Sequence, residues 1–137
     1  ANGKTQIFGT SRIDEGSFAG LTMAIKNNGG KGGQLHYKVA GDKYNNYIKT
    51  IDLACNGWHK YTITRSGNTL SIFFDDQLLA TKKIAENLDF GTVNLCFGAY
   101  INETWDYHNG NLVYDNVSIY DYALTEDQIK VLTANKM

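Results

Sequence analysis

The segment from residue 100 to residue 110 concentrates the side chains of this chain that are best suited to bind a polar ligand. Aromatic rings stack on the C–H faces of sugars, while planar amides and carboxylates pair with neighbouring hydroxyls. The segment supplies both kinds of group, in Tyr100, Asn102, Trp105, Asp106, Tyr107 and His108. We therefore expect a saccharide-binding loop here. The alternative is a long hairpin connection whose aromatic residues form a small core of their own.

A second polar and aromatic stretch covers residues 41–48 and contains Tyr44 and Tyr47 on either side of Asn45 and Asn46. These residues would extend the saccharide site if the stretch lies at the same rim or on the concave sheet. An Asn-Asn pair is equally typical of an ordinary hairpin turn, and this alternative stays open.

The sequence lacks the residue patterns that are typical of hydrolase active sites. Retaining glycosidases hold two carboxyl groups about 5–5.5 Å apart, often by an E-x-D-x-E strand, and that pattern is absent. The glutamates are isolated at positions 15, 86, 103 and 126. The three histidines, at positions 36, 59 and 108, have neither metal-ligand spacing nor a recognisable Ser/Cys-His-Asp order. We predict that the protein is not an enzyme.

Length, net charge and cysteine content limit the domain number and the kinds of partner that this chain can have. The 137 residues suffice for one domain, residues 1–137, and the net charge of −1 gives no electrostatic footprint for nucleic acid. No apolar run is long enough for membrane insertion. The two cysteines, Cys55 and Cys96, are too few for a disulfide scaffold, and the sequence leaves open whether they are bridged.

Apolar and polar residues alternate with a period of two in residues 21–25, 35–39, 61–64 and 70–74. Turns rich in Gly, Asn and Asp separate these runs, so short antiparallel strands are expected. A further strand is expected around residues 113–119, with Val113, Val117 and Ile119 pointing inward. Asp115 would lie on the same side, where a carboxylate needs a partner or a cation. Thr125 and Gln128 form a capping box that predicts one helix over residues 125–133.

Two ordered motifs carry a family resemblance. The first runs from Gly57-Trp58-His59 to Asp75-Asp76-Gln77-Leu78, and the second from His108 to Ile129, including Tyr120-Asp-Tyr-Ala-Leu124. Both resemble signatures of laminin-G-like, concanavalin A-like lectin and glucanase domains. The resemblance implies an all-β jelly-roll sandwich of two antiparallel sheets with one short C-terminal helix. The predicted core is Leu21, Met23, Leu35, Tyr37, Trp58, Tyr61, Ile63, Leu70, Ile72, Leu95, Phe97, Val117 and Ile119.

The usual N-terminal strands of the family are not recognisable, so we expect a fragment or module of a larger protein, or a compact variant. In the resembled family an acidic residue at the position of Asp115 often helps to bind a structural calcium ion, which makes Ca²⁺ the one cofactor to expect.

The fold hosts many functions. The resemblance implies non-catalytic binding of a glycan or cell-surface polysaccharide by an extracellular module. Its parent would be a bacterial glycosidase such as a sialidase, or a phage tail or baseplate protein that adheres to its host. The alternatives are a structural or protein-interaction module and the remnant of a glycoside hydrolase.

Overall fold

The computed structural model describes residues 4–10, 20–27, 33–39, 46–51, 57–85, 95–98 and 112–134. These residues belong to two compact units. One unit holds residues 1–55 and 89–114, and the other holds residues 56–88 and 115–137. Each unit is described below by itself.

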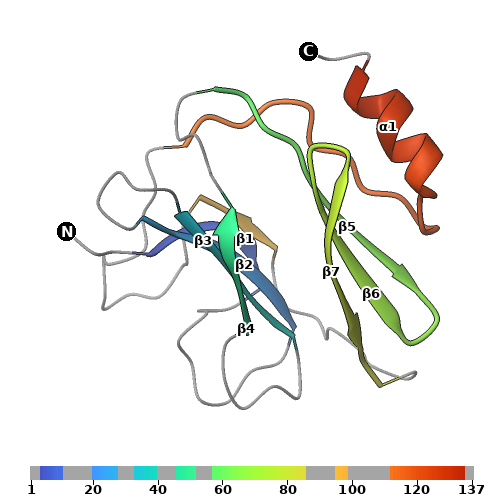
Figure 1. The fold of residues 1–137 in the computed structure, drawn as a ribbon, viewed down its shortest axis with the longest axis horizontal. Helices are drawn as coiled ribbons and strands as arrows, with labels where there is room; N and C mark the ends of the chain where they lie inside the picture. The colour runs from blue at the N-terminus through green and yellow to red at the C-terminus, as the bar shows by residue number, and fades with distance from the viewer. Residues whose placement is uncertain are drawn as a thin grey trace. The chain divides into compact units, whose positions relative to one another are not determined.

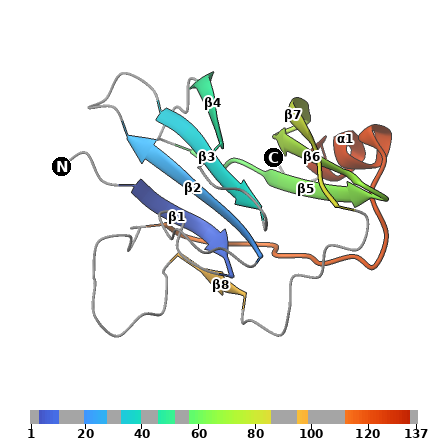
Figure 2. The ribbon, with the colours of Figure 1, turned by 90° about the horizontal axis from the view of Figure 1, so that it is seen from below.

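The first unit contains a five-stranded antiparallel sheet, with strand order β4-β3-β2-β1-β8 (Figures 1 and 2). Its strands are β1 (Lys4–Gly9), β2 (Leu21–Asn27), β3 (Gly33–Val39), β4 (Asn46–Ile51) and the short β8 (Cys96–Phe97). The runs predicted at residues 21–25 and 35–39 fall within β2 and β3, so both strands are confirmed.

The register of β2 and β3 explains why these strands pair as they do. Met23 lies opposite Tyr37, and Ile25 lies opposite Leu35, so the apolar residues of both strands share one face. Met23, Leu35 and Tyr37 are buried, as predicted. A one-residue slip would turn this apolar set to the opposite face, which carries Thr22, His36 and Lys38, so the different character of the two faces favours this register.

Strand β1 lies between β2 and β8 and has an irregularity around Ile7. Phe8 lies opposite Phe97 of β8, and their ring centroids are 6.3 Å apart. The hydroxyl of Tyr114 donates a 2.6 Å hydrogen bond to the carbonyl of Ile7, while its ring meets Phe97 edge-on at 5.8 Å. Tyr114 therefore contacts both β1 and β8 within this unit.

The second unit contains a three-stranded antiparallel sheet of order β5-β6-β7. Its strands are β5 (Tyr61–Ser66), β6 (Thr69–Phe74) and β7 (Gln77–Lys83), and they confirm the strands predicted at residues 61–64 and 70–74. Gly67, in the left-handed region at φ 56°, makes the tight turn from β5 to β6. Leu70 and Ile72 of β6 are 1% exposed and form the centre of this unit's core, as predicted.

Helix α1 (Glu126–Ala134) follows the sheet in the second unit and begins at the predicted capping box (Figure 1). The Thr125 N–H donates to Oε1 of Gln128 at 2.9 Å, and the Gln128 N–H donates to the Thr125 hydroxyl at 3.3 Å. Ile129 and Thr133 are buried, and the Thr133 hydroxyl donates to the Ile129 carbonyl at 2.9 Å within the helix. The same hydroxyl lies 3.4 Å from the carbonyl of Asp75, in the β6–β7 turn. The predicted helix is thus confirmed, and its buried side lies beside this turn. Within the described part of the chain, no helix is long and apolar enough to span a membrane.

The strand predicted around residues 113–119 is wrong, because residues 112–120 are described without strand structure. Val113, Val117 and Ile119 are exposed instead of pointing inward. The physical reason lies in the middle of the segment. Asn116 has a φ of 54°, which interrupts an extended chain, and its N–H donates to Oδ1 of Asp115 at 2.7 Å.

Of the other predicted core residues, Leu21, Tyr61 and Ile63 are half-buried, and three are exposed. Trp58 is 63% exposed, and Leu95 and Phe97 are also exposed. Trp58 lies three residues before β5 begins, and Leu95 and Phe97 lie in or beside the two-residue β8. Alternation assigns no face to Trp58 and Leu95, because both lie outside a regular strand, and the two residues of β8 are too few to show the alternation that would place Phe97.

Candidate functional site

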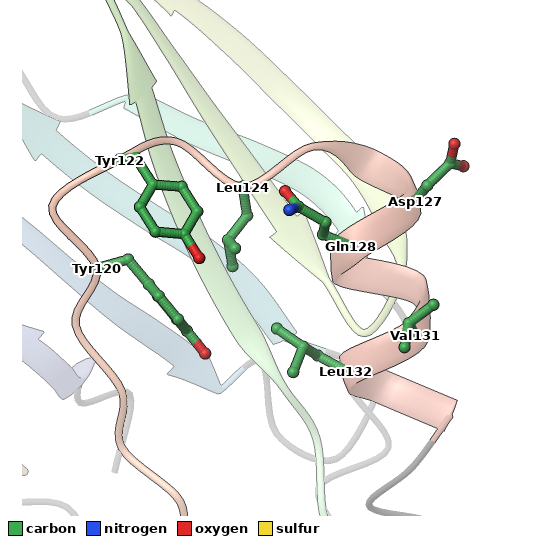
Figure 3. A pocket seen from close by; sticks show the side chains of 7 residues that line it. All are labelled: Tyr120, Tyr122, Leu124, Asp127, Gln128, Val131 and Leu132. Atoms are coloured by element: carbon green, nitrogen blue, oxygen red, sulfur yellow. The ribbon is translucent and has the colours of Figure 1, made fainter.

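A groove of 380 Å³ lies in the second unit, between the segment that precedes α1 and the helix itself (Figure 3). Its lining residues are Tyr120, Tyr122, Leu124, Asp127, Gln128, Val131 and Leu132. Positions 128 and 132 are four residues apart and therefore follow one another on the same side of a helix. The capping box fixes where the helix begins, and so it also fixes which residues line the groove.

Two tyrosine rings form one side of the groove. The centroids of Tyr120 and Tyr122 are 5.6 Å apart, and the rings meet edge to face at 62°. Tyr120 is 41% exposed and Tyr122 is 57% exposed, so a ligand can reach both rings. Figure 3 shows their hydroxyl ends turned toward the side chains of Leu124 and Leu132. The rings combine a flat apolar surface with a hydrogen-bonding hydroxyl, which is the combination that sugar recognition uses.

The helix supplies the opposite side of the groove. In Figure 3 the amide of Gln128 and the side chain of Leu132 point from the helix toward Leu124, while the carboxylate of Asp127 points away from the tyrosines. Oε1 of Gln128 already accepts the Thr125 N–H. The part of Gln128 that suits a ligand is therefore its amide nitrogen, which carries two donors.

A polar set of residues occupies one face of the five-stranded sheet in the first unit. Gln6, Thr22, His36 and Lys38 are all buried there. The amide nitrogen and oxygen of Gln6 have no hydrogen-bond partner among the residues that the structure describes. Gly9 keeps this face closely packed, because a Cβ at that position would stand 2.9 Å from Nε2 of Gln6.

The predicted site residues are only partly placed. Tyr100, Asn102, Trp105, Asp106, Tyr107, His108 and Tyr44 lie outside the described residues. Tyr47 lies in β4, opposite His36 in the register, and position 47 therefore shares the polar face of the sheet. The saccharide site formed by the loop of residues 100–110 together with Tyr47 stays a prediction.

Asp115, the predicted calcium ligand, is exposed, and one of its carboxylate oxygens accepts the Asn116 N–H. Within the described ranges, no three His, Cys, Asp or Glu side chains gather closely enough to hold a metal ion. Backbone carbonyls and other oxygens also ligate calcium. Binding of Ca²⁺ through Asp115 remains a prediction.

Sequence reasoning did not single out Tyr122 and Gln128 as ligand-binding residues. A usable signal was present, since Tyr120-Asp-Tyr122 stands just before a capping box whose helix places Gln128 and Leu132 on one side. In the sequence this motif carries the family resemblance, and only the structure shows that its two aromatic rings are exposed.

Comparison with curated protein sequences returns no match. Among solved structures, the chain is similar to an S-layer domain-containing protein (residues 221–444) from Clostridium thermocellum ATCC 27405, with 18% sequence identity and a TM-score of 0.48. That alignment covers 97% of this chain and 64% of the other chain, so this chain spans less than two thirds of it.

A family comparison matches residues 1–130 to the concanavalin A-like lectin/glucanases superfamily. The match agrees with the two antiparallel sheets and the short helix α1 among the described residues, and it confirms the predicted fold class. The chain therefore belongs to the concanavalin A-like lectin/glucanases superfamily.

Proposed function

We propose that this protein binds carbohydrate without catalysing a reaction, and that the groove between Tyr120, Tyr122 and helix α1 is a saccharide site. The observation that carries the proposal is the pair of half-exposed tyrosine rings beside an uncharged amide donor. The superfamily contains lectins as well as glucanases, which is consistent with binding but does not decide it.

The chemistry of the groove suits weak, stacking-dominated recognition. Each sugar hydroxyl exchanges water for protein with a small net gain, so hydrogen bonds alone give little affinity. The exposed faces of Tyr120 and Tyr122 supply the apolar contact that a sugar's C–H face needs. We expect a dissociation constant of about 0.1–1 mM for one short oligosaccharide, which corresponds to roughly 4–5.5 kcal/mol.

The wider setting is part of the same proposal. The chain serves as a lectin-like module of a larger extracellular protein, either a secreted bacterial glycosidase or a phage tail protein that adheres to its host. The glycan or cell-surface polysaccharide is its partner, and the other domains of the parent are its neighbours. Calcium at Asp115 would have a structural role, since Asp115 is not among the groove residues.

A glycan array, run with and without calcium, tests the proposal, and calorimetric titration of the best ligand follows. Tyr122→Ala should abolish measurable binding, because it removes the more exposed ring. Its thermal stability should change little, since a 57% exposed side chain contributes little packing. Tyr122→Phe is the matched control and should retain most of the binding, because it keeps the stacking surface.

Trp105→Ala tests the loop of residues 100–110 in the same titration. Loss of binding in this variant with retention in Tyr122→Ala would move the site from the groove to the loop. Absence of binding to every saccharide on the array would overturn the proposed function.

A second candidate function is that of a protein-interaction module. It is favoured by exposed apolar side chains of the second unit, where Val117 is 54% and Ile119 is 79% exposed. A contiguous exposed apolar patch is typical of a protein contact. A Val117→Ser/Ile119→Ser variant that loses a protein partner while keeping glycan binding would support this second function.

A further inference from the structure

From the groove, we infer that the ligand is a neutral saccharide that contains an N-acetylated amino sugar. The inference deepens the proposed function and depends on it. It rests on three properties of the groove: the absence of cations among its lining residues, the aliphatic side chains that face the tyrosines, and the amide donor of Gln128.

The charge of the lining excludes acidic sugars as the preferred ligand. Among the seven lining residues, Asp127 carries a negative charge, and no Lys, Arg or His supplies a positive one. A uronic or sialic carboxylate would lose part of its hydration in the groove without meeting a cation there. A neutral sugar does not meet this cost.

The aliphatic side chains then select among neutral sugars. Leu124 and Leu132 face the tyrosine rings, so a ligand that fills the groove covers both (Figure 3). A hydroxyl placed against these two aliphatic side chains would exchange water for an apolar contact on that side. The methyl group of an acetamide has no such need. Burying one such carbon favours binding by about fourfold.

The hydrogen-bonding groups complete the match. An acetamide has one carbonyl acceptor and one N–H donor. The amide nitrogen of Gln128 can donate to that carbonyl, because Oε1 of Gln128 is held by the Thr125 N–H at 2.9 Å. The hydroxyl oxygens of the tyrosines can accept the acetamide N–H. Together with the buried methyl group, one such bond gives a preference of about tenfold for an N-acetylated sugar over its hydroxyl counterpart.

The test uses calorimetric titration of the whole chain with three tetrasaccharides of the same linkage: the β-1,4-linked N-acetylglucosamine, glucose and glucosamine oligomers. The N-acetylated oligomer should bind about tenfold more tightly than the glucose oligomer. The β-1,4-linked glucuronic acid tetrasaccharide serves as the acidic probe and should bind more weakly than both.

Gln128→Glu is the decisive variant. Glutamate keeps an oxygen for the Thr125 N–H and so preserves the capping box, while it removes the amide donors. The tenfold preference should fall to about fourfold or less, with an unchanged melting temperature, because only the methyl contact remains. The cationic glucosamine oligomer should gain affinity, since the groove then carries a second carboxylate.

The outcomes separate the inference from the proposed function. Equal affinity of the wild-type protein for the glucose and N-acetylglucosamine oligomers would overturn the inference and leave carbohydrate binding intact. An unchanged preference in Gln128→Glu would overturn it as well. Binding to none of the oligomers and to no saccharide on the array would overturn both.

Discussion

Replacing Ile72 by alanine tests how the core of the three-stranded unit is built. Ile72 is 1% exposed in the central strand β6, whereas Ile63, directly opposite it in β5, is only half-buried. Truncating a fully buried isoleucine costs about 2–5 kcal/mol, through lost transfer energy and the cavity that remains. We expect Ile72→Ala to lower the free energy of unfolding by an amount in that range. Ile63→Ala should cost roughly half as much, since water already reaches part of the Ile63 side chain.

Urea unfolding followed by circular dichroism measures both free energies of unfolding. Ile72→Val is the graded control and should cost about 0.5–1.5 kcal/mol. The double variant should cost less than the sum of the single variants, because the two side chains share one contact across the strands. If Ile63→Ala were as destabilising as Ile72→Ala, the assignment of β6 as the buried centre of this unit would be refuted.

Two further predictions concern single side chains at the edges of the fold. Thr125→Ala should destabilise the protein by about 1 kcal/mol, because it removes the side-chain acceptor of the helix cap, whereas Thr125→Ser should be nearly neutral in the same urea experiment. Burial raises the pKa of Tyr114 above its ordinary value of 10.0, although a hydrogen bond from the Gly98 backbone acts the other way. The folded protein therefore keeps the phenol proton at a pH where the unfolded chain has lost it, and the stability due to Tyr114 is complete below about pH 10 and falls as the pH rises further. Tyr114→Phe should reduce this alkaline loss, and an identical pH dependence in the two proteins would contradict it.

The strands and the helix were predictable because their signals are local. Alternation over five residues is enough to specify a half-buried strand, as in residues 21–25 and 35–39, and both strands formed. The cap between Thr125 and Gln128 involves residues three apart, so the sequence alone specified where α1 begins. The family resemblance rested on motifs of the same local kind, and the family comparison confirmed it.

Tertiary structure decided which of the apolar residues are buried, because the alternation of apolar and polar residues does not specify this. The apolar pattern at Val113, Val117 and Ile119 suits a strand, but the left-handed Asn116 breaks the extended chain in its middle. Trp58 is a large aromatic residue of the kind expected in a core, yet it is 63% exposed. It lies outside the regular strand β5, so alternation does not predict which way its side chain points.

The groove could not be predicted from the sequence, because it depends on tertiary structure. The sequence shows Tyr120, Tyr122 and a helix with Gln128, but not that the segment before the helix folds beside it and leaves both rings exposed. That arrangement follows from the burial of Ile129 and Thr133, which fixes the side of α1 that faces the sheet. The sequence determines which groups are available to bind a ligand. Packing against distant residues decides which of them meet, because burial depends on partners that no local pattern specifies.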